Sequence, residues 1–136
     1  MIKISEISLE DCIRLHREMW TYIAEHLDEE LDNDSYEAQI DTRTSLKERY
    51  CTRLINNNII DDYPQHFCFL CQYAENHDEW NRCEQCPAIW GTENIITIDD
   101  VYCEYEVDNQ SEDVLNWVLS NPEDIANVKI KENLLK

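Results

Sequence analysis

The 136-residue chain is poor in the residues that interrupt regular structure, with one glycine and three prolines. A single glycine excludes the glycine-rich phosphate loops of P-loop and Rossmann nucleotide-binding proteins. An all-β sandwich would need many more turn-forming residues. No segment approaches the roughly 18 consecutive apolar residues of a membrane span, and the segment MIKISEISLE lacks the basic and apolar regions of a signal peptide. We therefore expect a soluble cytoplasmic protein with no membrane partner, and few interruptions to its helices.

Basic residues are also scarce. Lysine and arginine number 11 against 30 acidic residues, so that the net charge is −19. No lysine or arginine occurs from Cys83 to Val128, whereas eleven acidic residues do, and a second acidic run spans Asp28 to Asp41. Nucleic-acid-binding proteins use clustered cations to neutralise phosphates. The charge thus predicts that the chain does not bind nucleic acid directly and favours a protein partner with a basic surface.

Apolar periodicity predicts two long helices in the first sixty residues. The segment after Ser8 carries apolar residues at i, i+3, i+4 and i+7, with Ser8 as N-cap and Asp11 in the capping-box position. A second helix is expected over much of Tyr36 to Asn57. Its inward face is predicted to hold four residues: Leu46, Tyr50, Cys51 and Leu54.

The last forty residues predict smaller elements. Residues Ile95–Ile98 and Val101–Val107 are expected to form a β-hairpin, because apolar residues alternate with acidic ones along the second strand. Ser111 is expected to cap a short helix, and Pro122 to occupy the first position of another. The expected fold is a single α+β domain, mainly helical, made of a helical part (1–60), a zinc-binding segment (66–91), and a hairpin with C-terminal helices (95–136).

Two Cys-x-x-Cys pairs carry the strongest chemical signal in the chain. Cys68 and Cys71 are followed after eleven residues by Cys83 and Cys86. Each pair places two thiolates on one ion, and two such pairs complete the tetrahedral site of a structural zinc ion. Chance spacing or redox chemistry by one pair is the alternative, although thioredoxin-like chemistry uses a single pair beside a βαβ unit.

Other candidate ligands flank these pairs. Cys103, His66 and His77 are conceivable alternates, and a structural role is expected for each. Cys12 and Cys51 lie on predicted helix faces and are interpreted as core residues. His16 lies on the apolar stripe of the first helix and is interpreted as a core histidine hydrogen-bonded to a neighbour.

These motifs resemble a group of small proteins from phages and prophages of Firmicutes. The resemblance rests on LHREMWTYIAEHL at 15–27, CFLCQYA at 68–74, CEQCPAIWG at 83–91, the later Cys103 and a late IANV. Only the cysteine block is specific. The group has no established activity, and the resemblance implies a zinc site and phage provenance, and with it the cytoplasm of a bacterial host. The acidic stretches at 28–41 and 99–113 are additions of this chain.

The leading functional hypothesis is a non-enzymatic zinc protein that binds and inhibits a host protein, as a nucleic-acid mimic. Two acidic sets are the candidate partner-binding residues: Glu104, Glu106, Asp108, Glu112 and Asp113, then Asp28, Glu29, Glu30, Asp32 and Asp34. One alternative is that the charge only keeps the protein soluble. Another is a nucleic-acid-binding zinc module using the cations from Arg43 to Arg53, which we expect instead to balance nearby acids. A metal-dependent enzyme is the weakest hypothesis, and the oligomeric state is left open.

Overall fold

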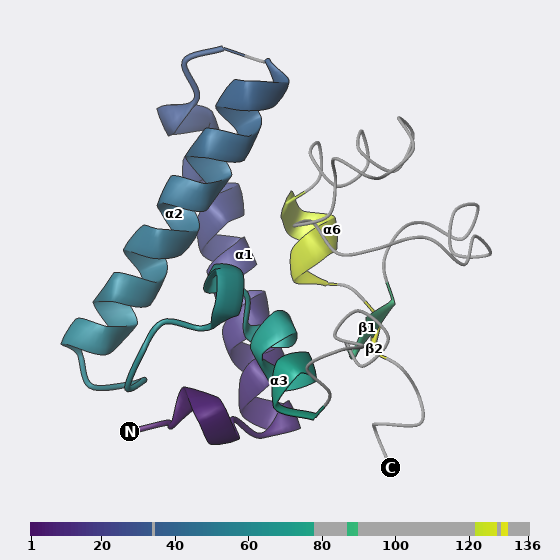
Figure 1. Ribbon diagram of the computed structural model, residues 1–136. Coiled ribbons are helices and arrows are strands. Elements are labelled where there is room, and N and C mark those ends of the chain that lie inside the picture. The colour runs from purple at the N-terminus through teal and green to yellow at the C-terminus, as the bar shows by residue number, and fades with distance from the viewer. Residues whose placement is uncertain (34, 78–86, 90–121, 128, 131–136) are drawn as a thin grey trace.

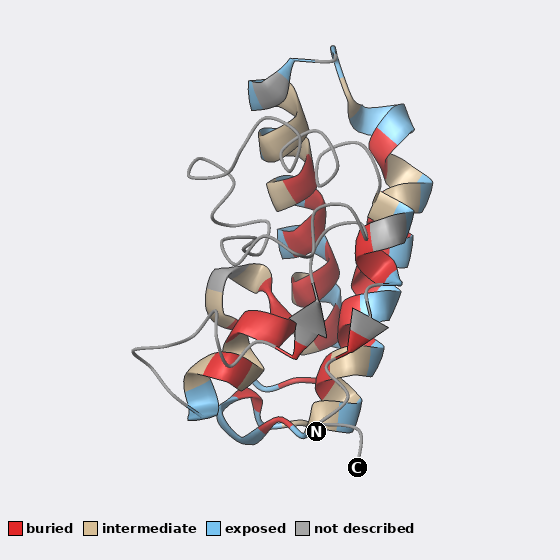
Figure 2. Ribbon diagram, turned by 90° about the vertical axis from the view of Figure 1, so that its right-hand side faces the viewer, coloured by how far each residue is buried: buried red, intermediate tan, exposed pale blue. Residues whose placement is uncertain are grey.

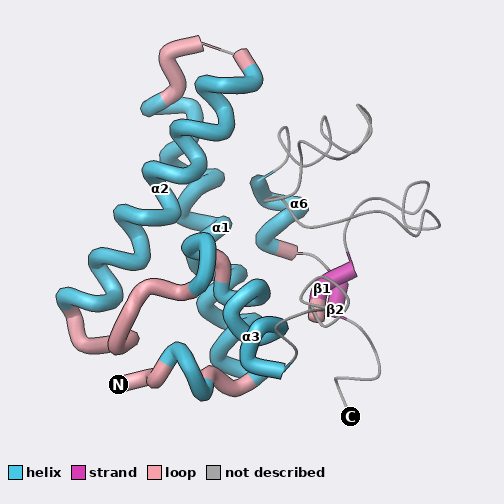
Figure 3. Tube along the Cα trace, in the orientation of Figure 1, coloured by secondary structure: helices cyan, strands magenta, loops and turns pink. Residues whose placement is uncertain are grey.

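The computed structural model describes residues 1–33, 35–77, 87–89, 122–127 and 129–130. This part of the chain is mainly helical, as the sequence predicts (Figure 3). Its elements in chain order are the 3-10 turn η1 (Ile4–Glu6), helices α1 (Leu9–Glu30) and α2 (Tyr36–Asn56), the 3-10 turn η2 (Gln65–Phe67), helix α3 (Phe69–His77), strand β1 (Ala88–Ile89), helix α6 (Pro122–Ala126) and strand β2 (Lys129–Ile130).

The first long helix begins at its predicted N-cap, and the second lies within its predicted range, with a serine cap that was not predicted. Ser8 is the N-cap of α1, and its hydroxyl accepts a hydrogen bond from the backbone N–H of Asp11. Ser35 does the same at α2 with the N–H of Ala38. Each serine satisfies a backbone donor that the first turn leaves without an intrahelical partner. The caps explain why the chain turns abruptly into helix at these residues.

Helix α1 is the central element of the fold. It contacts α2 along one side, α3 near its N-terminal half and the short α6 on another side (Figure 1). Buried residues line the faces that the helices turn toward each other, and exposed residues lie on the outer faces (Figure 2). The buried residues of α1 are Cys12, Leu15, His16, Met19, Trp20, Tyr22, Ile23 and Leu27.

The predicted inward face of α2 is confirmed, since Leu46, Tyr50, Cys51 and Leu54 are all buried. Burial of a large apolar side chain contributes roughly 1.5–3 kcal/mol. The core continues from these helices into α3 and α6, where it includes Phe69, Leu70, Ala74, Ile125 and Ala126.

The N-terminal residues are tied to the segment that follows α2. The N–H of Ile2 donates to the carbonyl of Ile59 at 2.8 Å, and the N–H of Asp61 donates to the carbonyl of Ile2 at 3.0 Å. These bonds form a parallel bridge between Ile2 and Ile60.

Strands β1 and β2 form a short antiparallel pair, in which Ala88 lies opposite Ile130. The hairpin predicted at 95–107 and the helix predicted after Ser111 lie outside the described residues. Pro122 begins α6, as predicted. In the described part of the chain, no helix combines the length and apolar character that crossing a membrane requires.

Candidate metal centre

Cys68 directly precedes α3, and Cys71 lies in its first turn. The backbone N–H of Cys71 donates to the Sγ atom of Cys68 at 3.2 Å. This is the i to i+3 pattern that Ser8 and Ser35 make at the starts of α1 and α2. An N–H donor and the positive end of a helix both favour a thiolate, which is the form of cysteine that binds metal. The two cysteines therefore lie together at a position suited to a metal ligand pair.

The backbone just before Cys68 is strained. Phe67 has φ of 53°, in the left-handed region that bulky side chains rarely adopt. Such a residue costs roughly 1–3 kcal/mol and persists where surrounding contacts hold it. The ring of Phe67 packs edge-on against Tyr63 with centroids 5.7 Å apart. Phe67 ends η2, and Cys68 follows it with its sulfur at the start of α3.

Polar side chains brace this turn against the N-terminal segment. The Oε1 atom of Gln72 accepts from the N–H of Gln65 at 2.9 Å, and its Nε2 donates to Oδ1 of Asn76. Asn76 in turn donates to the carbonyl of Ile4 at 3.0 Å. The cysteine pair thus sits on an element joined by hydrogen bonds to both η2 and η1.

The cysteine pair is also joined to the core. Cys68 and Cys71 are 6% and 2% exposed. Cys12 of α1 donates from its thiol to the carbonyl of Phe69 at 3.4 Å. Burial raises the pKa of Cys51 to about 12, with Lys47 lowering it and Cys68 raising it further. Cys12 and Cys51 are therefore core residues, as the sequence predicts, and Cys51 keeps its proton at neutral pH.

The remaining candidate ligands divide between described and undescribed residues. Cys83, Cys86 and Cys103 lie outside the described residues, as does the side chain of His66. His77 lies at the far end of α3, where its Nδ1 donates to the carbonyl of Tyr73 at 2.9 Å. Among the described residues, no three histidine, cysteine or acidic side chains are grouped as metal ligands. The described part of the centre is the pair Cys68 and Cys71.

The structure describes the residues that directly follow the second cysteine pair. Pro87, which follows Cys86, is buried, and β1 begins at the next residue. Through β1 this segment pairs with Lys129 and Ile130 near the C-terminus.

Part of the candidate partner-binding set lies at the C-terminal end of α1. Asp28, Glu29, Glu30 and Asp32 are exposed there, and we call them the acidic tip. The last turn of α1 contains no basic residue. Because a helix C-terminus is negative, acids are unfavourable at this position. Asp34 lies outside the described residues, as do Glu104, Glu106, Asp108, Glu112 and Asp113.

Two acids of the tip lie near basic side chains: Glu30 is bonded to Arg49, and Glu29 lies 3.7 Å from Nδ1 of His26. Both carboxylate oxygens of Glu30 accept from Arg49, at 2.6 and 2.9 Å. The bond to Arg49 lowers the pKa of Glu30. It also raises the pKa of Arg49, and a bond to Tyr22 raises it further. For this pair, the expected balancing of α2 cations by nearby acids is observed.

Two other cationic residues of α2 are buried, and their burial was not predicted from the sequence. Arg43 and Lys47 are 1% and 3% exposed. Both lie over the ring of Trp20, at 5.8 and 5.1 Å from its centroid. Their spacing from Leu46 and Leu54 places them on the inward stripe of α2, a signal that was visible in the sequence. Neither cation is presented on the surface of the protein.

His16 lies beside these cations. It is buried, and its Nε2 lies 2.8 Å from the carbonyl of Ile125 in α6. A carbonyl only accepts, so Nε2 carries the hydrogen. Burial lowers the pKa of His16 to about 4, with Lys47 and Arg17 lowering it further and the bond to Ile125 opposing them. His16 is thus the hydrogen-bonded core histidine that the sequence predicts.

Comparison of the chain with models of protein families, with curated proteins and with solved structures finds no match.

Proposed function

We propose that the protein is a non-enzymatic, phage-type acidic protein, stabilised by one zinc ion, that binds and inhibits a host protein with a basic surface. The zinc ion would be held by Cys68, Cys71, Cys83 and Cys86. The observation that carries the metal site is the hydrogen bond from the Cys71 N–H to the Cys68 sulfur at the start of α3. When bound, zinc supplies a closed structural cross-link and no open position for catalysis.

The cross-link would connect two parts of the chain. Cys68 and Cys71 belong to the core that α1 and α2 form, and the second pair lies twelve or more residues further on. Binding energy from such a site is folding energy. In this proposal zinc fastens segment 66–91 and the hairpin at 95–107 to the helical part.

Metal binding by the full chain tests the site. We expect one zinc ion per chain by mass spectrometry of the native protein, and a sulfur-to-cobalt absorption band after exchange with cobalt. C68S and C83S are each expected to lose most of the bound metal, because each removes one of four ligands. The matched control is C51S, which removes a buried thiol of the same core and is expected to keep full metal content. A wild-type chain without zinc, or a C51S variant as depleted as C68S, would contradict the proposal.

The acidic tip supports the proposed partner. Asp28 and Glu29 lie in the last turn of α1, where the helix carbonyls already make the potential negative. Acids placed only for solubility gain nothing from this costly position. A basic surface would neutralise the helix end and the carboxylates together, with fast and salt-sensitive association. The second acidic set, around Glu104 and Glu106, is proposed as part of the same recognition.

Burial of α2 cations counts against the nucleic-acid-binding alternative. Arg43 and Lys47 are buried over Trp20, and Arg49 is bonded to Glu30. A phosphate backbone needs several exposed cations on one face.

Paired charge variants test the partner proposal. Tagged protein is incubated with nuclease-treated lysate of a Firmicutes host and eluted with duplex DNA. We expect one stoichiometric basic protein, displaced by DNA, and weaker capture by D28N/E29Q, because the variant removes carboxylates from the tip. E6Q/E10Q removes the same number of charges in η1 and the first turn of α1, far from the tip, and is expected to capture normally. If D28N/E29Q, E6Q/E10Q and E104K/E106K all captured the partner equally well, the nucleic-acid-mimic proposal would be wrong. The negative charge would then serve only solubility.

A further inference from the structure

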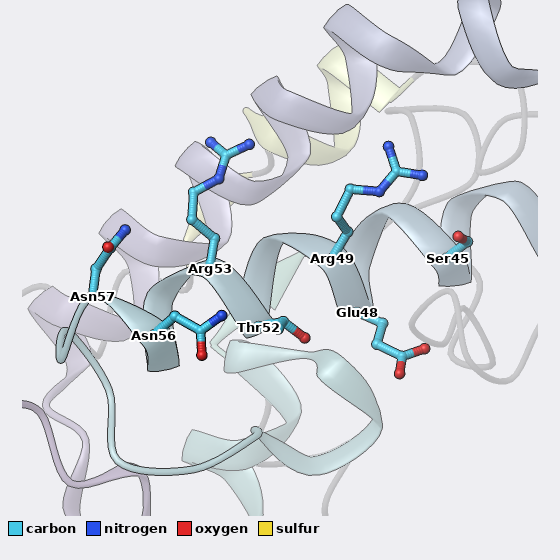
Figure 4. A pocket seen from close by; sticks show the side chains of 7 residues that line it. All are labelled: Ser45, Glu48, Arg49, Thr52, Arg53, Asn56 and Asn57. Atoms are coloured by element: carbon cyan, nitrogen blue, oxygen red, sulfur yellow. The ribbon is translucent and has the colours of Figure 1, made fainter.

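A second surface, on the outer face of α2, has a different character from the acidic tip. A shallow groove of about 620 Å³ runs there between Ser45 and Asn57, lined entirely by polar and charged side chains (Figure 4). Twelve residues of helix at 1.5 Å each span about 18 Å. An open groove of this length fits an extended peptide better than a compact small molecule.

Arg53 is the residue that gives the groove its chemistry. Its guanidinium lies over the ring of Tyr22, 4.9 Å from the centroid, and Tyr22 is itself buried. Within the described residues, no carboxylate lies within 4 Å of Arg53 and no acceptor bonds to its donors. The aromatic ring therefore orients the side chain of an exposed arginine. Such preorganisation lowers the entropy cost of binding an oxyanion.

Arg49, one turn earlier, shows the contrast. Its guanidinium extends toward α1 on the same side of α2 as that of Arg53 (Figure 4). Glu30 occupies it with two hydrogen bonds. The chain has nearly three acidic residues for each lysine or arginine. Arg49 is bonded to a carboxylate, whereas in the described part of the chain no carboxylate is bonded to Arg53. The charge of Arg53 is thus available to a ligand.

Exposed apolar side chains adjoin the polar lining of the groove. Tyr63 donates or accepts a hydrogen bond through its hydroxyl with Thr52 at 2.9 Å, and it is 41% exposed. Ile59, two residues beyond the groove residue Asn57, is 38% exposed. The groove that contains Arg53 thus adjoins an exposed aromatic side chain at Thr52.

We propose that this groove binds an acidic peptide segment of a partner protein, with a carboxylate on Arg53 and an apolar side chain against Tyr63. Arginine recognises a carboxylate through two parallel, charge-assisted hydrogen bonds. A nucleic acid is disfavoured because Glu48 lines the groove and the net charge is −19, so that a continuous polyanion would be repelled. A short segment with one or two carboxylates interacts mainly with charges close to Arg53, since salt screens charges beyond roughly 8 Å. The groove meets the acidic tip at the Arg49–Glu30 pair, and its proposed contacts involve neither Asp28 and Glu29 nor the candidate zinc ligands.

Selection from a displayed library of random heptapeptides on the immobilised full chain tests this site. We expect selected sequences to be enriched in aspartate or glutamate beside an aromatic or aliphatic residue. The most frequent sequence is then synthesised with a fluorescent label and titrated by anisotropy. R53Q is expected to weaken its binding about tenfold, as for loss of a charge-assisted pair. R53K, which keeps the charge and loses the planar fork, is expected to lie between R53Q and the wild type.

The matched control is R17Q, which removes an exposed arginine of α1 outside the groove and is expected to bind within twofold of the wild type. Circular dichroism establishes that each variant is folded. Three results would overturn the proposal: no enrichment of acidic residues, equal binding by R53Q and wild type, or displacement of the peptide by oligothymidylate at concentrations no higher than unlabelled peptide requires.

Discussion

His16 illustrates how burial sets the chemistry of a single residue. Its imidazole is enclosed by α1 and α6 and donates to the Ile125 carbonyl. A protonated ring at this position would be desolvated and would face the positive charges of Lys47 and Arg17. The folded protein therefore holds the neutral form, whereas the unfolded chain binds a proton near the ordinary pKa of 6.5.

His16 is expected to make stability depend on pH. Because its folded pKa is about 4, its contribution is full above pH 6.5 and declines as pH falls toward 4, by about 3 kcal/mol in total. The free energy of urea unfolding, measured from pH 7.5 to 4 for wild type and H16Q, checks this. Glutamine retains an N–H donor and does not titrate. The difference between the two proteins should change in favour of H16Q as pH falls, and parallel curves would contradict the assignment.

The hydrogen bond to the sulfur of Cys68 is a feature that the sequence does not determine. The spacing of Cys68 from Cys71 predicts a ligand pair, but the sequence does not reveal that its sulfur accepts an N–H at a helix start. That arrangement depends on Phe67 adopting positive φ, which the residue type disfavours. Contacts with distant residues, such as Asn76 with Ile4, hold the segment in place.

At the scale of elements, capping and periodicity were sufficient for α1 and α2. Their boundaries follow from Ser8 and Ser35, and their buried faces follow from apolar residues at helical spacing. Helix α3 was not predicted, because its nine residues are too few for the helical period of apolar residues to repeat clearly. Its position is stabilised by packing against α1.

The two caps are expected to have measurable and similar effects. S8A and S35A should each lower the free energy of unfolding by about 1 kcal/mol, because each leaves a first-turn N–H without its acceptor. Urea unfolding followed by circular dichroism measures the change. T21A is the control: the Thr21 hydroxyl bonds only to the Arg17 carbonyl within α1, and alanine has the higher helix propensity. If T21A lowered the free energy of unfolding as much as S35A does, the loss could not be attributed to the capping hydrogen bond.

At the scale of the whole molecule, excess negative charge opposes folding. The net charge of −19 is spread over 136 residues, and self-repulsion favours expanded states. The buried core must offset this repulsion, and in the proposed function a zinc cross-link helps it to do so.

Salt is therefore expected to stabilise the protein. Raising sodium chloride from 0.05 to 1 M shortens the screening length from more than 10 Å to about 3 Å and weakens the repulsion. The urea midpoint should rise. Ion pairs such as Arg49–Glu30 lose little, because exposed pairs contribute little. A midpoint that falls with salt would show that favourable pairs outweigh the net charge.

The sequence by itself determined the features that depend on neighbouring residues: the two long helices with the N-cap at Ser8, the inward stripes of α1 and α2, the start of α6 at Pro122, and the mainly helical class. Tertiary structure alone decided the features that join distant residues. Arg43 and Lys47 became buried because both lie over Trp20. Arg49 and Arg53 acquired different environments because Glu30 reaches only the first. Local periodicity specifies which face of a helix is apolar, but only packing specifies which residues of another helix that face meets.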